Sequence, residues 1–118
     1  MLYLFKFRMI LFYAAFLNVL FLPSVAVAEY NANMDGELAH IMVYADGDYI
    51  YFRLKNQPTS HPRCKPDYFV VSEDVPEARL NRIYSRLLAA YAAKEVVNIG
   101  FDAKTECVHG YIKVHRVG

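Results

Sequence analysis

The sequence predicts a mainly β fold with one helix, in the order β-β-β-α-β-β. Three observations lead to this prediction: apolar and polar residues alternate in short segments, a helical apolar stripe follows the third segment, and turn-forming residues separate the segments. Five strands with the only helix between strands three and four is the element order of an OB-like five-stranded barrel. An open antiparallel sheet with the helix across one face has the same order and stays as the alternative.

The first two strands read as a hairpin. Residues 38–45 are rich in β-forming residues, and Asp46-Gly47-Asp48 then signals a tight turn. Residues 49–55 alternate cleanly, so one face of this strand is expected in the core and the other outside. The inward side chains are Ile50, Phe52 and Leu54, and the outward ones are Tyr49, Tyr51, Arg53 and Lys55.

The segments around this hairpin are less regular. Residues 29–36 are polar and have no period, which predicts a loose N-terminal arm. Residues 56–66 contain three prolines and are expected to form a loop. A short third strand is predicted at residues 68–71.

A helix is predicted over residues 76–93. Ser72-Glu73-Asp74 offers an N-cap, and Pro76 suits the first turn. Apolar residues then recur at the spacing of one helical stripe, while arginines occupy the opposite, solvated side. The stripe consists of Leu80, Ile83, Tyr84, Leu87, Leu88 and Tyr91.

Two more strands complete the predicted barrel. Residues 95–101 alternate, with Val97, Ile99 and Phe101 on one face, and residues 102–110 form a loop. The last strand covers residues 111–117. Its inward side chains are Ile112 and Val114, and its outward ones are Tyr111, Lys113 and His115.

The first 28 residues have the pattern of a signal peptide. Lys6 and Arg8 form a basic region, an apolar run follows, and Ala26-Val27-Ala28 is a small-x-small cleavage motif. The apolar run is about 14 residues long, shorter than the roughly 20 of a membrane-spanning helix. We expect cleavage after Ala28, a single exported domain over residues 29–118, and a periplasmic or secreted location. An uncleaved signal anchor is the alternative.

Cys64 and Cys107 are the only cysteines and are predicted to form one disulfide. An exported chain meets an oxidising environment, and two cysteines allow a single internal pairing. The sequence has no C-x-x-C and no histidine pair beside either cysteine, which argues against redox or zinc chemistry. Closing a loop of this length stabilises a fold by about 4 kcal/mol in the chain-entropy model.

No catalytic or metal-binding motif is present. The four histidines have no H-E-x-x-H spacing, and the chain lacks a G-x-S-x-G elbow, a calcium loop and a glycine-rich phosphate loop. A formal net charge of +1 provides no electrostatic reason to expect nucleic acid. We therefore expect no enzyme activity, no cofactor or metal, no nucleic-acid partner and no membrane association after signal cleavage.

Tyrosine is the unusual feature of the chain. Eight of the ten tyrosines follow residue 28, and the chain has no tryptophan. Outward tyrosines beside cationic residues suit protein interfaces and sugars. Tyrosine also has a high strand propensity, so an outward row without function is the alternative. The candidate binding face consists of Tyr49, Tyr51, Arg53, Tyr111, Lys113 and His115.

Residues 87–96 (LLAAYAAKEV) resemble small exported proteobacterial proteins of unknown function, in which a helix passes through a basic residue into a valine-rich strand. Cys64 before an aromatic strand and Cys107 before a final Ile-x-Val strand fit the same pattern, with Ala93 where the family usually has glycine. Those proteins are similar to the glycan-binding B subunits of subtilase-type pentameric toxins, which are disulfide-containing OB-folds. The resemblance covers residues 36–117 and implies the fold and export, but no sugar-binding residue matches.

Together these features predict a small exported, disulfide-stapled binding or interaction protein without catalysis, with a protein or a glycan as its partner. A structural or oligomer-forming subunit of the envelope or toxin type, whose tyrosine face meets a copy of itself, is the alternative. A small secreted enzyme is a third, weaker interpretation.

Overall fold

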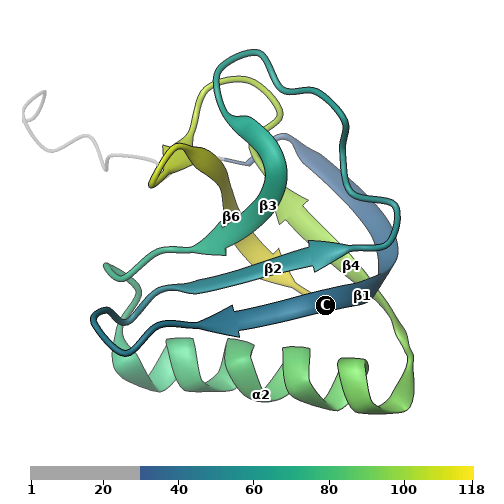
Figure 1. Cartoon of the computed structure of the whole chain (residues 1–118), viewed down its shortest axis with the longest axis vertical. Helices are drawn as coiled ribbons and strands as arrows, with labels where there is room; N and C mark the ends of the chain where they lie inside the picture. Colours follow the sequence, from purple (N-terminus) through teal and green to yellow (C-terminus); the bar gives the residue numbers. More distant parts are fainter. Residues whose placement is uncertain (1–29) are drawn as a thin grey trace, which may run out of the picture.

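The computed structural model describes residues 30–118, so the predicted signal peptide lies outside the described residues. Six strands and one helix follow one another in this part of the chain (Figure 1). Five of the strands are those that the sequence predicts, and a two-residue strand is added before the last. The elements are β1 (Ala32–Val43), β2 (Ile50–Leu54), β3 (Lys65–Val71), α2 (Glu77–Ala93), β4 (Val96–Phe101), β5 (Cys107–Val108) and β6 (Tyr111–Val117).

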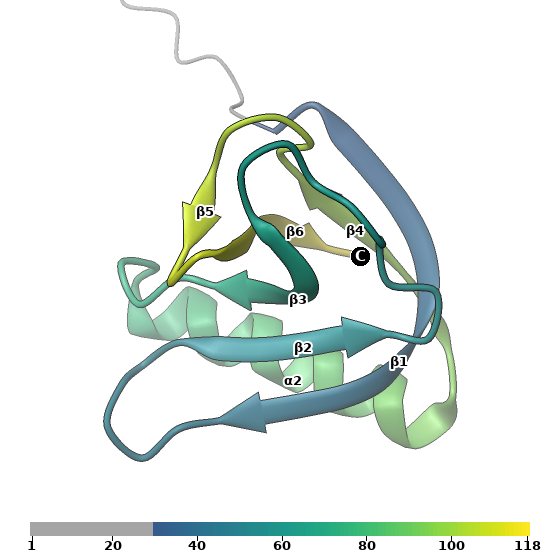
Figure 2. The ribbon, with the colours of Figure 1, turned by 45° about the horizontal axis from the view of Figure 1, so that its top comes forward.

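The strands close into a barrel. β1 pairs antiparallel with β2 on one side and with β4 on the other, β2 pairs with β3, and β4 pairs with β6. A parallel pairing of β3 with β6 joins the two ends of the sheet. The ring β1-β2-β3-β6-β4 is the five-stranded OB-like barrel, and α2 covers one end of it (Figures 1 and 2). The predicted fold class is confirmed, and the open sheet is wrong.

Strand β1 is longer than the sequence prediction and makes this closure possible. The predicted loose arm over residues 29–36 is wrong, because residues 32–37 pair with β4 in a continuous register from Ala32↔Phe101 to Glu37↔Val96. From Leu38 onward β1 pairs with β2 instead, and the register of this pairing has an irregularity between Leu38 and His40. Such irregularities bend a strand, so one strand serves both neighbours.

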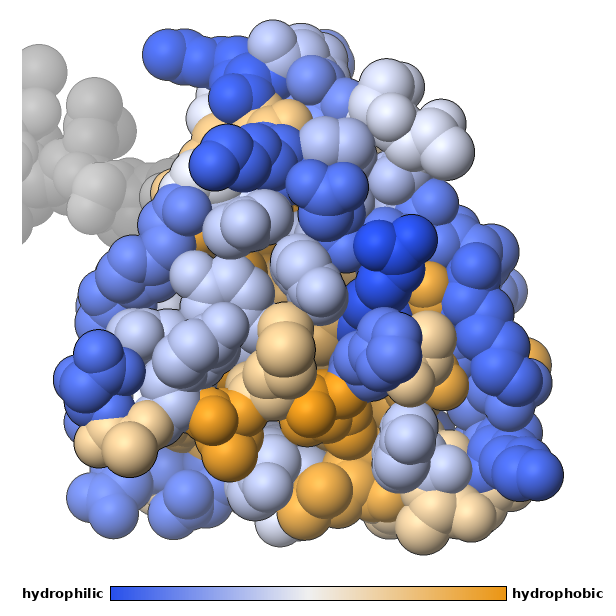
Figure 3. Space-filling view, in the orientation of Figure 1, coloured by the Kyte–Doolittle hydropathy of each residue, from blue (hydrophilic) through white to orange (hydrophobic). Residues whose placement is uncertain are grey.

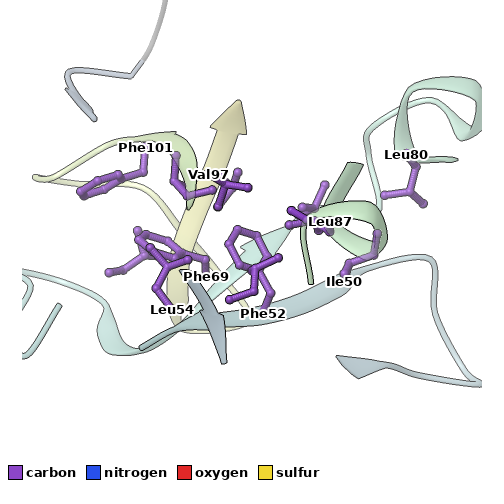
Figure 4. Close-up of a cluster of buried hydrophobic side chains, with 14 of the residues drawn as sticks. Ile50, Phe52, Leu54, Phe69, Leu80, Leu87, Val97 and Phe101 are labelled. Carbon is purple, nitrogen blue, oxygen red and sulfur yellow. The ribbon is translucent and has the colours of Figure 1, made fainter. Parts of the chain in front are cut away.

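The inward faces of the strands meet in one apolar core (Figure 4). Phe52, Leu54, Phe69 and Ile99 are fully buried, and the Phe69 ring lies 5.5 Å from that of Phe52 and 5.2 Å from that of Phe101. The predicted alternation of β2 is confirmed for its inward side. A one-residue slip would move every one of these side chains to the outside, so the core defines the register.

Helix α2 begins one residue after the predicted start and without the predicted cap. Its N-cap residue is Pro76, which makes no side-chain hydrogen bond to the first turn. The Ser72 hydroxyl instead accepts a hydrogen bond from the Asp74 amide at 3.4 Å, ahead of the helix. Ser72 therefore stabilises the turn between β3 and α2, a local use of serine that competes with helix capping.

The buried stripe of α2 is narrower than predicted. Leu80, Leu87 and Ala90 are buried, with Ile83 and Tyr84 packed at the edge of the core. Leu88 and Tyr91, which the sequence pattern places in the stripe, are 43% and 51% exposed. A single helix against the end of a small barrel contacts it along one line, so only one side of the stripe is covered.

The predicted disulfide between Cys64 and Cys107 is present, with the two Cα atoms 5.5 Å apart. It ties the residue before β3 to β5, a short strand that the sequence prediction treats as loop. The predicted loop over residues 56–66 also ends sooner, because β3 begins at Lys65, whose amide donates to the Gly110 carbonyl at 2.8 Å. The disulfide and this hydrogen bond therefore both connect the β5–β6 hairpin to the start of β3.

Apolar side chains also reach the surface. Figure 3 shows them gathered over β1 and α2, below a more hydrophilic upper half. Among the described residues, the large exposed apolar side chains are Val43, Tyr44, Leu88, Tyr91 and Val96. Within residues 30–118, no helix is long and apolar enough to cross a membrane.

Candidate functional site

Six aromatic side chains meet on the outside of the barrel. We call this group the tyrosine cluster. Its members come from the β1–β2 turn, the three strands β2, β3 and β6, and the β5–β6 turn. They are Tyr44, Tyr49, Tyr51, Tyr68, His109 and Tyr111.

Tyr51 is the centre of the tyrosine cluster. Its ring centroid lies 5.3 Å from that of Tyr44, 5.5 Å from Tyr49, 5.4 Å from Tyr111 and 6.1 Å from Tyr68. All four of these pairs are edge-to-face, as the quadrupoles of aromatic rings prefer. Although Tyr51 is on the outward face of β2, its neighbours leave it only 9% exposed.

The strand pairing explains why the rings meet. β3 lies between β2 and β6, so the outward residues of these three strands form one surface. Val70 stands on this surface, opposite Tyr51 on one side and Lys113 on the other, yet it is fully buried. The outside of the barrel therefore carries a second, small apolar layer.

Polar groups contact the rings at the end of the tyrosine cluster formed by the β1–β2 and β5–β6 turns, which we call its hairpin end. The Tyr49 hydroxyl donates to Asp46 at 3.2 Å, and the His109 ring lies 4.6 Å from the Tyr49 ring. His109 also contacts the carboxylate of Glu73 at 3.0 Å. His109 and Gly110 both have positive φ, 51° and 84°, as the two central residues of a type I′ hairpin turn require.

The electrostatics of the tyrosine cluster favour neutral tyrosines. Loss of hydration among the neighbouring rings raises the pKa of Tyr51, and the nearby Tyr44, Tyr111 and Glu73 raise it further. Loss of hydration and the hydrogen bond to Asp46 raise the pKa of Tyr49. A hydrogen bond from its own backbone and the contact with His109 lower the pKa of Glu73. At neutral pH the cluster therefore presents tyrosine hydroxyl groups, with the carboxylate of Glu73 beside them.

The opposite end of the tyrosine cluster, formed by Tyr68 and Tyr111 on β3 and β6 and called its strand end, lies beside a cation instead. The Lys65 ammonium lies 5.5 Å from the centroid of the Tyr111 ring, within range of a cation–π contact. Tyr68 packs edge-to-face against Tyr111 at 5.7 Å. One end of the cluster is thus flanked by acids and the other by a base.

The structure divides the candidate face that the sequence predicts. Tyr49, Tyr51 and Tyr111 come together, but Lys113 and His115 contact Glu106, at 3.8 Å and 2.6 Å. Arg53 donates to the Asp67 carbonyl at 3.4 Å.

Sequence reasoning missed Tyr44, Tyr68 and His109. Alternation with the buried Phe69 could have placed Tyr68 on the outer face, but Tyr44 and His109 lie in turns that have no period. Their place depends on the geometry of the two hairpins.

The described residues offer rings, hydroxyl groups and charges for binding. Among residues 30–118, no group of three or more histidine, cysteine, aspartate or glutamate side chains is placed to hold a metal ion. Comparisons with protein-family models, with curated proteins and with solved structures give no match to this chain. The resemblance to small exported proteins and toxin B subunits therefore stays a prediction.

Proposed function

We propose that this protein is a small exported binding protein without catalytic activity, and that the tyrosine cluster is its binding face for a protein or a glycan. The observation that carries the proposal is the arrangement of five aromatic rings around Tyr51 on the outside of a barrel that already has a complete core. Strand propensity alone explains isolated outward tyrosines, but it does not explain rings from two turns and three strands that converge.

The position of the tyrosine cluster on the barrel supports the proposal. OB-folds bind their ligands on the face of strands two and three and on the loops that flank it. The tyrosine cluster occupies β2 and β3, the β1–β2 turn and the turn before the last strand. Tyrosine rings with exposed edges and hydroxyls are also frequent anchors in protein interfaces.

Export is supported by the sequence pattern of the first 28 residues and by the disulfide. Disulfides persist in oxidising compartments and are rare in the cytosol. The small charge of the chain suits a neutral glycan or a mixed protein surface rather than nucleic acid.

A glycan array and a partner pull-down with the oxidised protein test the proposal. Tyr44→Ala and Tyr111→Ala should each lose at least about tenfold in affinity for the ligand that wild type selects, the effect of truncating an aromatic anchor. Tyr91→Ala is the matched control, because Tyr91 is an exposed tyrosine on α2 outside the tyrosine cluster. Equal binding by all three variants would show that the cluster is not the binding face.

Self-association is the second candidate function. Val43, Leu88, Tyr91 and Val96 expose apolar surface away from the core, and such surface is frequent where protein chains meet. Light scattering on the purified protein separates the two candidates. A stable oligomer that Leu88→Asp dissociates supports a structural subunit, and a monomer supports a binding protein.

A further inference from the structure

A hollow of about 160 Å³ lies beside the tyrosine cluster, between the β1–β2 hairpin and α2. Pockets for whole small-molecule ligands are larger, roughly 300–1,000 Å³. A cavity of about 150 Å³ holds a single benzene ring. The hollow therefore has room for one side chain.

The lining of the hollow combines apolar, aromatic and acidic groups. Ile50 and Leu80 are buried core residues, and they provide an apolar floor. Tyr49 and Tyr84 contribute two aromatic rings, and Tyr49 belongs to the tyrosine cluster as well. Asp48 is the one charged residue of the lining.

The carboxylate of Asp48 is available to a ligand. Within residues 30–118 it makes no ion pair and no hydrogen bond, whereas its neighbour Asp46 accepts the Tyr49 hydroxyl. A side chain with a long apolar stem, a flat cationic head and an affinity for tyrosine rings matches this lining. Arginine has these properties, because its guanidinium stacks on aromatic rings and pairs with carboxylates.

Two other hollows among the described residues do not select one sign of charge. The hollow at the start of α2 is lined by Asp74 together with Arg79 and Lys113. The hollow at the end of α2 is lined by Glu37 together with Lys55 and Lys94. Of these three hollows, only the one between the β1–β2 hairpin and α2, which we call the hairpin hollow, combines apolar walls with a purely negative charge.

The tyrosine cluster, like the hollow, favours a cationic ligand at the end that lies next to the β1–β2 hairpin. Lys65 already covers the Tyr111 ring, whereas Tyr44 at the hairpin end is 46% exposed and has no cation–π contact with any residue from 30 to 118. A cationic group of a partner is therefore attracted to the hairpin end rather than to the strand end.

We propose that the hairpin hollow binds an arginine side chain presented by a partner protein, which then lies along the tyrosine cluster. This inference rests on the proposed binding function and assigns its ligand to proteins rather than glycans. The arginine head pairs with Asp48, its stem lies over Ile50 and Leu80, and Tyr49 and Tyr84 flank it.

The test uses Nα-acetyl-L-arginine amide as the probe and the neutral isostere Nα-acetyl-L-citrulline amide as its comparator. Each is titrated into the oxidised ¹⁵N-labelled protein while the backbone amide signals are recorded. The arginine probe should give saturable shifts at Gly47, Asp48 and Asn81, and citrulline should bind at least about threefold more weakly, the effect of an exposed ion pair. Equal binding of the two probes to the wild-type protein would overturn the inference.

Variants of Asp48 provide the second arm. Asp48→Asn should weaken the arginine probe about threefold, and Asp48→Lys should abolish saturation. Asp67→Asn, an exposed aspartate on β3 outside the hollow, is the matched control and should bind like wild type. Unchanged binding by Asp48→Lys contradicts the inference.

The outcome also separates this inference from the proposed function. If tyrosine variants lose a glycan that wild type binds, while the arginine probe does not bind, the arginine inference fails and the binding function stands. If neither the tyrosine variants nor the Asp48 variants alter any binding, both fail.

Discussion

Lys94 shows how a single residue ends the helix. It adopts the left-handed conformation, with φ 56°, and its amide reaches back to the carbonyls of Ala90 and Tyr91. Helices often end this way, but glycine is the usual residue because a Cβ destabilises the left-handed region. Glu95 then closes the motif by donating to the Ala90 carbonyl at 2.9 Å.

Lys94→Gly should therefore stabilise the protein by about 1 kcal/mol, because it removes the Cβ from a left-handed position. Urea denaturation measures the change, with Lys94→Ala as the control that keeps the Cβ. If glycine lowers the unfolding free energy relative to alanine, the left-handed helix end is wrong.

Asp102 shows how one carboxylate organises a loop. It accepts hydrogen bonds from the Thr105 hydroxyl at 2.6 Å, the Lys104 amide at 2.8 Å and the Asn31 amide group at 2.9 Å. These bonds, with Thr105 first and Lys104 next, lower the pKa of Asp102 to about 2. The loop that precedes β5 is thereby joined to the residue before β1.

The lowered pKa of Asp102 predicts a pH dependence of stability. An unfolded aspartate titrates near pH 3.9, so between about pH 4 and pH 2 the unfolded state binds more protons than the folded state. Stability from Asp102 is complete above pH 4 and is lost as the pH falls through 2. Urea midpoints from pH 2 to pH 5 should fall less steeply in Asp102→Asn, and an unchanged slope would contradict this role.

At the scale of elements, α2 offers two adjacent leucines in opposite environments. Leu87 is fully buried against the barrel, and Leu88 is 43% exposed. Leu87→Ala should lower the unfolding free energy by about 2–5 kcal/mol, and Leu88→Ala by less than about 0.5 kcal/mol. Thermal or urea denaturation compares them directly. Similar losses for both would mean that the helix is rotated relative to this packing.

The sequence pattern predicts most elements but not the full length of β1. The side chains of Phe52 and Ile99 alternate with polar neighbours, so their strands are visible in the sequence. Residues 32–36 also alternate, but with small or weakly apolar inward residues such as Ala32 and Gly36. Their strand depends on backbone pairing with β4, more than sixty residues later, which no local pattern records.

Some residues of the candidate site could likewise be predicted from the sequence, and others could not. Tyr49, Tyr51 and Tyr111 could be predicted as outward residues from period two alone. Tyr68 joins them because β3 lies between β2 and β6, and His109 joins because a type I′ turn aims it at Tyr49. These are tertiary relations, and they also bury Tyr51, which the sequence pattern places in solvent.

At the scale of the whole molecule, the disulfide connects stability to the site. Cys64 and Cys107 are 43 residues apart, and the bridge fastens the hairpin that carries His109 to the strand that carries Tyr68. Replacing both with serine should lower the unfolding free energy by about 4 kcal/mol. Urea denaturation measures this, and near-UV circular dichroism should show a weaker tyrosine signal. Equal midpoints for the oxidised protein and the double variant would show that the bridge adds no stability.

The central claim is that the tyrosine cluster, outside a barrel with a complete core, is where this protein meets its ligand. Site-specific photocrosslinking in the native compartment tests it most directly. A p-benzoylphenylalanine at Tyr44 replaces one exposed tyrosine of the cluster, and the same group at Tyr91 replaces an exposed tyrosine on α2. The account predicts a light-dependent adduct from position 44 that Asp48→Lys or Tyr111→Ala diminishes, and none from position 91. Adducts from position 91 alone, or equally from both positions, would contradict it.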